Sequence, residues 1–357
     1  MTRNTFFDKD FGELDARPLD NAEIINARRI INGQDDGLMQ VHPVKHTWAQ
    51  SLYDDMVANN WTQAEVNLQK DVDMWNSDNA LTEQEKHIYL RALAFASNLD
   101  GMQTTNLANN IIRHITSPEV VMCVVRQTYE EALHVKSYAT MVESLGMDPD
   151  LVYGLYRKDQ ALYEKNQEVL KAVNKIAIDT FHTGTLKNDQ MFLEACVGNI
   201  ILEGIYFYSA FLVFYVLKRN NKMPGSAEMI QFINRDEDMH LKVFINITNT
   251  IKEEQPELWT KDFQKRIRKN VIDAVNMEYS WGKSCVGTGI LGLIPEELRQ
   301  YLEFVGDVRL QQIGLSKEWN SKNPFSWIDE FTQGSMIETN FFEGTVREYQ
   351  SGTLEWH

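Results

Sequence analysis

The stretch Glu131-Ala132-Leu133-His134, with its counterpart Glu237-Asp238-Met239-His240, decides how the rest of the chain is interpreted. Each reads Glu-x-x-His, and residues three apart share one face of an α-helix, so each pair directs a carboxylate and an imidazole to one point. One such pair is more often an exposed helix face than a ligand pair. Two pairs, each within a long helical segment, indicate a shared metal centre, because a four-helix bundle with two metal ions takes Glu-x-x-His from two helices and a lone carboxylate from each of the others.

Two further helical segments supply the lone carboxylates. Asp100 alone would more often be a solvated helix residue, whereas Glu203 is the single acid in the apolar stretch from Ile200 to Leu217. The complete ligand set is Asp100, Glu131, His134, Glu203, Glu237 and His240. Four carboxylates and two imidazoles suit two divalent ions of the iron or manganese type, since zinc usually takes fewer ligands and more nitrogen or sulfur. Without metal, repulsion among the acids should raise their pKa values.

Helical periodicity dominates the chain, and no convincing strand alternation is found. We predict helices over 46–60, 82–115, 118–145, 151–175, a segment carrying Glu203 that ends near 221, a segment beginning after 226, and 260–281 and 295–313. Thr82 with Glu85 fits a capping box, and Ser117 and Ser226 are expected N-caps. Residues 1–40 are interpreted as an N-terminal arm with little regular structure, 41–322 as the helical domain, and 323–357 as a flexible C-terminal tail.

Charge and apolar content argue against two kinds of partner. The net charge of −16 disfavours nucleic acid and anionic membrane surfaces. The apolar stretch 200–217 is long enough to cross a membrane, but Glu203 would be costly in lipid, so we prefer a central helix of the bundle. The three widely spaced cysteines form neither a disulfide framework nor a zinc pattern. A reducing, cytoplasmic location is therefore expected.

Tyr138 lies four residues after His134, on the helical stripe that carries two ligands. Phe207 and Phe211 follow Glu203 by four and eight residues and could enclose a dry pocket around the tyrosine. A tyrosine beside an oxygen-activating metal pair can lose an electron and a proton and persist as a radical. The alternative is a core tyrosine with a satisfied hydroxyl. Asp236, next to Glu237, is a natural acceptor for a metal-bound imidazole.

From about residue 45 to the C-terminus, the chain resembles the small, radical-generating subunit of class I ribonucleotide reductase. The motifs that carry the resemblance are Asp100-Gly101-Met102-Gln103 and the stretches 131–138, 202–208 and 235–240. The resemblance implies an all-α, ferritin-like four-helix bundle with additional helices, whose dinuclear site reacts with molecular oxygen and oxidises Tyr138. The radical would then move to a cysteine of a separate large subunit, which reduces ribonucleotides to deoxyribonucleotides. Two metal ions per chain are implied; iron is expected, with Mn/Fe and Mn/Mn as alternatives because the ligands suit all three.

The resemblance also assigns roles that composition alone would not select. Trp61 looks like the tryptophan of the electron route, coupled through Asp236 to His134. Tyr349 looks like the tail tyrosine that relays the radical between subunits, and the tail beyond it resembles the part that docks on the large subunit. A homodimer and an electron-donor protein are further expected partners. The alternatives are a packing tryptophan at a helix end and a disordered tail.

Several interpretations remain open at this point. Arg113-His114-Ile115-Thr116 and the stretch 142–146 are similar to a branch with a mixed manganese–iron site, which typically replaces the radical tyrosine and often has Glu as first ligand. Tyr138 and Asp100 instead favour a tyrosyl radical, so the oxidising equivalent could rest on the tyrosine or on the metals. A di-metal oxygenase or desaturase would use the same ligands but leave Trp61 and Tyr349 without a role. Iron storage and a purely structural bundle are the remaining alternatives.

Overall fold

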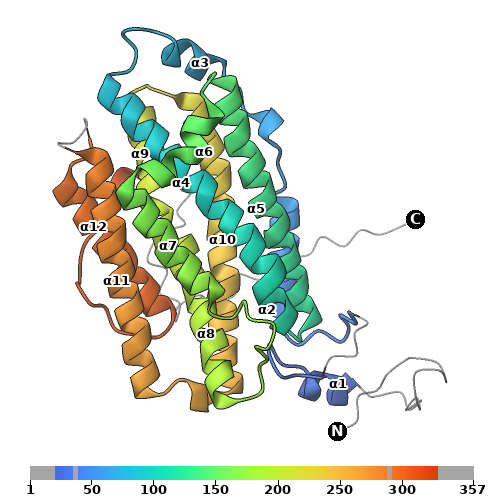
Figure 1. The fold of residues 1–357 in the computed structure, drawn as a ribbon. Coiled ribbons are helices and arrows are strands. Elements are labelled where there is room, and N and C mark those ends of the chain that lie inside the picture. Colours follow the sequence, from blue (N-terminus) through green and yellow to red (C-terminus); the bar gives the residue numbers. More distant parts are fainter. Residues whose placement is uncertain (1–20, 35–38, 288–291, 329–357) are drawn as a thin grey trace, which may run out of the picture.

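The computed structural model describes residues 21–34, 39–287 and 292–328. Within these ranges the chain is helical and contains no β-strand, which confirms the predicted all-α class. Figure 1 shows the long helices running side by side along the molecule, with α1 at one end and α3 at the other. The helices in chain order are α1 (Asn21–Ala27), α2 (Thr47–Ala58), α3 (Gln69–Trp75), α4 (Glu83–Asn106), α5 (Pro118–Ser144), α6 (Pro149–Lys158), α7 (Gln160–Asn174), α8 (Leu186–Ile201), α9 (Tyr208–Arg219), α10 (Pro224–Glu254), α11 (Lys261–Val286) and α12 (Pro295–Gln312).

The central bundle consists of α4, α5, α10 and the continuous stretch formed by α8 and α9. α4 packs on α5 and α9, and α10 packs on α5, α8 and α9. α2 covers α5 and α10, while α11 packs on α12 along another side of the bundle (Figure 1). The arrangement is the predicted ferritin-like bundle with additional helices.

Short irregular turns interrupt or join these helices. Two are π-helical, η2 (Leu107–Ile111) and η4 (Leu202–Tyr206). The others are 3₁₀ turns: η1 (Gln63–Glu65), η3 (Ile112–His114), η5 (Pro256–Leu258) and η6 (Ser326–Ile328). η4 carries Glu203, and π-turns of this kind are frequent at functional sites.

Two predicted helix signals are confirmed. Thr82 caps α4: the backbone N–H of Thr82 donates to Glu85 Oε2 at 2.8 Å, and the N–H of Glu85 donates to Thr82 Oγ1 at 3.2 Å. α5 begins at Pro118 and ends at Ser144, followed by Gly146 with φ of +66°, which only glycine adopts easily. Local sequence rules therefore locate the start of α4 and both ends of α5.

One predicted N-cap is confirmed in its position, and the other is wrong. Ser117 is the N-cap residue of α5, but its side chain makes no capping hydrogen bond, because the hydroxyl lies 2.8 Å from His46 Nδ1 and is used there. α10 begins at Pro224, so Ser226 lies inside its first turn, where its N–H donates to Asp71 Oδ2 at 2.6 Å. Asp71, from a helix that the sequence did not predict, thus caps α10 from outside.

The predicted helix over 151–175 is also divided. α6 ends at Lys158 and α7 begins at Gln160, with Asp159 between them. The Asp159 carboxylate lies 2.5 Å from Arg91 and accepts a hydrogen bond from the N–H of Leu162 at 3.0 Å. A partner on α4 therefore fixes the break.

Among the described residues, one helical stretch, Leu186–Arg219, is long and apolar enough to cross a membrane by length and composition alone. Its apolar window is entirely buried inside the protein, as a central bundle helix requires. Gly204 within it lets the Arg309 guanidinium approach: Arg309 Nε donates to Gly204 O at 3.0 Å, and a Cβ on this glycine would lie 2.6 Å from the same nitrogen.

The two predicted terminal segments are described only in part. α1 lies within residues 1–40, and Ile30 and Ile31 after it are fully buried. At the other end, Phe325 and Ile328 are buried against the bundle. Tyr349 and the rest of the predicted tail lie outside the described residues.

Candidate metal centre

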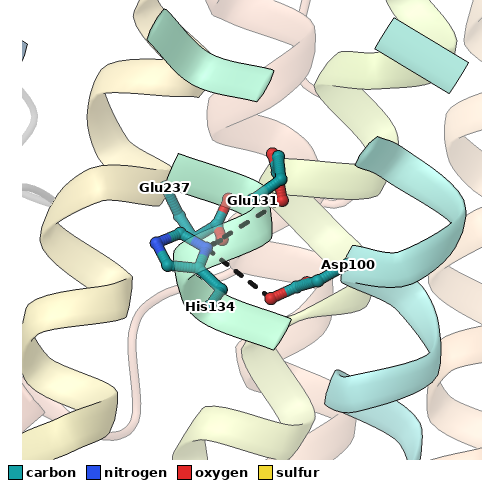
Figure 2. Close-up of side chains that lie close together, drawn as sticks. All are labelled: Asp100, Glu131, His134 and Glu237. Carbon is teal, nitrogen blue, oxygen red and sulfur yellow. Dashed lines mark ion pairs between the residues drawn. The ribbon is translucent and has the colours of Figure 1, made fainter. Parts of the chain in front are cut away.

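The structure brings the six expected ligands together in the middle of the bundle. None is more than 2% exposed. Figure 2 shows four of them pointing toward one another from α4, α5 and α10. The contributing elements are α4 (Asp100), α5 (Glu131 and His134), η4 (Glu203) and α10 (Glu237 and His240).

Their ligand atoms form two overlapping groups. In each group, one atom from every member lies within 4.8 Å of the others. The first group contains Asp100, Glu131, His134 and Glu237, and the second contains Glu131, Glu203, Glu237 and His240. Because Glu131 and Glu237 belong to both groups, they would contribute to both metal positions if two ions were bound.

Both histidines turn Nδ1 toward the carboxylates. His134 Nδ1 lies 3.0 Å from Glu237 Oε1 and 3.6 Å from Asp100 Oδ2. His240 Nδ1 lies 3.2 Å from Glu131 Oε1 and 3.2 Å from Glu237 Oε2. Each imidazole thus presents the same nitrogen to the centre and leaves Nε2 for another partner.

Unpaired buried atoms test whether this set fits a metal pair. Five carboxylate oxygens and one imidazole nitrogen of the cluster make no hydrogen bond of acceptable geometry, although Glu237 Oε1 and His134 Nδ1 face each other at 3.0 Å. The six atoms are Asp100 Oδ1 and Oδ2, Glu131 Oε2, Glu203 Oε2, Glu237 Oε1 and His134 Nδ1. Buried polar atoms are normally paired, and buried charges are normally paired or bound to metal. Two divalent cations would satisfy these atoms and balance the four carboxylates, so the donor set fits a dinuclear centre.

The acids perturb one another strongly. Burial raises the pKa values of Asp100, Glu131 and Glu203, and the negative charges of neighbouring carboxylates raise them further. Burial acts in the same direction on Glu237, but hydrogen bonding with Glu203 and the charge of His240 bring its pKa below its usual range. The predicted rise is therefore wrong for Glu237, because one acid of the cluster keeps its charge when its neighbours carry the protons.

Tyr138 is fully buried on α5. Burial raises the pKa of its hydroxyl, and the charges of Asp100 and Glu237 raise it further. The hydroxyl is thus close enough to the centre for the charges of two proposed ligands to act on it. Phe207 and Phe211 are also buried and stack on each other with centroids 5.2 Å apart.

Trp61, Asp236 and His134 form one hydrogen-bonded row, as the sequence resemblance implied. Trp61 Nε1 donates to Asp236 Oδ2 at 2.6 Å, and His134 Nε2 lies 3.2 Å from the same oxygen. The Trp61 and His134 rings are 6.4 Å apart between centroids and 27° from parallel. Trp61 is only 2% exposed, so the row is shielded from solvent.

Sequence reasoning missed three residues around the ligands. Glu130 Oε2 lies 2.9 Å from His240 Nε2. Gln103 and Gln127 both donate to Glu203 Oε1, the latter at 3.1 Å. The sequence offered two signals for these residues. Glu130 directly precedes the ligand Glu131, and the glutamines lie three residues after Asp100 and four residues before Glu131, on the helix face of each ligand.

Comparison with known proteins gives consistent matches. The profile of the family described as "Ribonucleotide reductase, small chain" matches residues 38–324. Ribonucleoside-diphosphate reductase subunit beta of Chlamydia pneumoniae is 36% identical over 334 residues, which cover 93% of this chain and 96% of the relative. The corresponding subunit of Treponema pallidum is 31% identical over 332 residues, or 91% of each chain. The solved ribonucleotide reductase R2 subunit from Clostridium botulinum matches with a TM-score of 0.79 at 33% identity, covering 85% of this chain and 94% of its own.

Proposed function

Because the chain belongs to the family of ribonucleotide reductase small chains, we propose that it generates and stores a radical on Tyr138 beside a dinuclear metal centre. As the small subunit of a ribonucleoside-diphosphate reductase, it would deliver that oxidising equivalent to a large subunit. The observation that carries the proposal is the pair of four-residue groups that share Glu131 and Glu237. Tyr138 is buried, and the charges of Asp100 and Glu237 act on its hydroxyl, which supports it as the residue that would be oxidised.

Each proposed ligand has a definite place. Asp100 and His134 would hold one ion, Glu203 and His240 the other, and the shared glutamates both. When bound, the ions supply the oxidising power by reacting with molecular oxygen. Iron is the proposed metal, with Mn/Fe and Mn/Mn as alternatives that the same donors would accept.

The surrounding protein controls water and protons. Burial of all six ligands keeps the centre dry, which favours a long-lived radical. Tyr138 must release its phenolic proton when it is oxidised. With two ions bound, Asp100 would be ionised, and it is then the candidate acceptor because its charge acts on the Tyr138 hydroxyl.

The proposed exit for the oxidising equivalent begins at the row of His134, Asp236 and Trp61. From there it would pass to Tyr349 and to the large subunit, which binds the C-terminal tail. A homodimer, an electron-donor protein and a cytoplasmic location complete the proposal; the three buried, free cysteines support a reducing compartment.

Tyr138→Phe tests the proposal, with Tyr215→Phe in α9 as a matched control at another buried tyrosine. The Tyr138 variant should bind two metal ions, show no tyrosyl radical by electron spin resonance, and fail to support ribonucleotide reduction by the cognate large subunit. The Tyr215 variant should keep the radical and the activity. Full activity in Tyr138→Phe would assign the oxidising equivalent to the metals, and absence of metal binding by the unmodified protein would refute the centre itself.

A further inference from the structure

Glu130 contacts Nε2 of His240 in the same way that Asp236 contacts Nε2 of His134. His240 Nε2 lies 2.9 Å from Glu130 Oε2, and Glu130 is 2% exposed. When Nδ1 binds a metal ion, the proton of the neutral imidazole is on Nε2, from which it would be donated to Glu130. A carboxylate in this place fixes the tautomer and the ring orientation of a metal-binding histidine.

The two carboxylate–histidine contacts cross between the same two helices. His134 of α5 pairs with Asp236 of α10, whereas His240 of α10 pairs with Glu130 of α5. In each case the acid directly precedes a ligand glutamate in the sequence. Each half of the centre therefore has one histidine whose Nε2 contacts an acid of the opposite helix.

The two halves differ in the second partner of each acid, on the side away from the histidine. Asp236 accepts a hydrogen bond from Trp61, an oxidisable ring. Glu130 Oε1 instead accepts from Arg126 Nε at 2.9 Å, and a guanidinium is a fixed positive charge that does not take part in electron transfer. One histidine is thus connected to an electron carrier and the other to an ion pair.

Arg126 also contacts the end of α2. Its Nη2 donates to Met56 O at 3.2 Å and to Asn60 Oδ1 at 3.0 Å, just before Trp61. From the other side, Arg235 donates to Asn59 O. The last carbonyls of a helix have no partner within it, and here two arginines satisfy them.

We propose that Glu130 is a positioning residue for His240 and that Arg126 couples it to the turn that carries Trp61. The His240 side of the centre then acts as a rigid anchor, and the His134 side carries the electron. Binding of an ion at the position of Glu203 and His240 is then linked, through Glu130 and Arg126, to immobilisation of residues 56–62, the segment that carries Trp61. The inference rests on the proposed dinuclear centre and adds to it a residue and a coupling.

Stepwise binding of Mn(II) to the metal-free, full-length protein tests the first part. Glu130→Gln should weaken one of two binding steps about 10- to 100-fold and leave the other within about threefold. The control is Glu303→Gln, which removes an equivalent i,i+4 pair with Arg299 on α12 and should change neither step. With one Mn(II) bound, the Glu130 variant should show the resonance of an isolated ion.

A double-mutant cycle separates positioning from general damage. If Glu130 acts through His240, Glu130→Gln should cause no further loss of Mn(II) affinity in a His240→Ala background. Fully additive losses, or two unchanged binding steps in the single variant, would overturn the inference. Neither result would contradict the proposed dinuclear centre. That proposal would be refuted only if the unmodified protein did not bind two ions.

Hydrogen exchange tests the coupling to Trp61. Mn(II) should slow amide exchange over residues 56–62 of the unmodified protein by at least about threefold. Arg126→Gln should abolish that slowing, and Arg299→Gln should preserve it. An equal slowing in Arg126→Gln would show that the turn is independent of the metal position.

Discussion

Replacing Glu119 by Gln should destabilise the metal-free protein, because this buried carboxylate joins the segment before α2 to the first turn of α5. Glu119 Oε1 accepts hydrogen bonds from the backbone N–H groups of Lys45 at 3.0 Å and His46 at 2.9 Å. Arg28 lies 3.3 Å from the other carboxylate oxygen, and Glu119 is 1% exposed. The substitution removes the charge while nearly preserving the shape.

The size of the effect follows from the pKa of this carboxyl. Burial alone would raise it, but hydrogen bonds from His46 and the charge of Arg28 lower the pKa from 4.5 to about 2. A lowered acid pKa stabilises the fold above the unfolded value, and this contribution is lost as pH falls through the folded value. At about 1.4 kcal/mol per pKa unit, Glu119 contributes roughly 3 kcal/mol at pH 6 and roughly 1.4 kcal/mol at pH 3.

Urea unfolding of both proteins between pH 3 and pH 6, with a chelator present, measures this difference. The range stays below the usual pKa of 6.5 for His46, so that this residue remains protonated in the unfolded chain. Glu303→Gln, at a partly exposed ion pair, should cost less than about 1 kcal/mol at any pH. A difference below about 0.5 kcal/mol at pH 6, or one that grows toward pH 3, would refute the linkage argument.

Two further predictions concern other buried hydrogen bonds. Asp236→Asn should weaken one Mn(II) binding step about 10- to 100-fold and stop ribonucleotide reduction while the tyrosyl radical still forms, because the amide carries no negative charge and holds the N–H groups of Trp61 and His134 more weakly; normal turnover with the large subunit would contradict it. Ser226→Ala should lower the free energy of unfolding by about 1–3 kcal/mol, because Asp71 loses a donor and Tyr89 loses its partner at 2.8 Å. An unchanged urea midpoint would show that water replaces the hydroxyl.

Sequence patterns predicted the helices well where the signals are local. The capping box of Thr82 and Glu85 involves residues three apart, so its geometry is fixed within one turn. Ser226 shows the opposite case, because the residue that caps α10 is Asp71, far away in the sequence. The break at Asp159 likewise depends on Arg91 of another helix. Single-sequence rules cannot identify such partners.

The ligands could be predicted for the same reason, since Glu-x-x-His is a spacing within one helix turn. Glu203 was predicted as an inward-pointing ligand, but the local backbone geometry around it could not be predicted. It lies in the π-turn η4, whose wider i to i+5 hydrogen bonding changes the helix register, and the surrounding stretch is apolar on every side. With no polar face in the pattern, nothing in the sequence marks where the register changes.

The placement of Trp61 shows how these separate contacts combine. At the start of α2, the His46 ring lies 2.8 Å from Ser117 and 3.1 Å from Glu254, and its N–H donates to Glu119. At the end of the same helix, Arg126 and Arg235 bind the last carbonyls. α2 contributes no proposed ligand, yet its two ends are held by α5 and α10, the helices that carry the two proposed histidine ligands. Trp61, the proposed electron carrier on the loop after α2, therefore keeps its distance to His134 only as long as those helices keep their register. The crossed acid–histidine pairs would then be required for the proposed electron transfer as well as for the proposed metal binding.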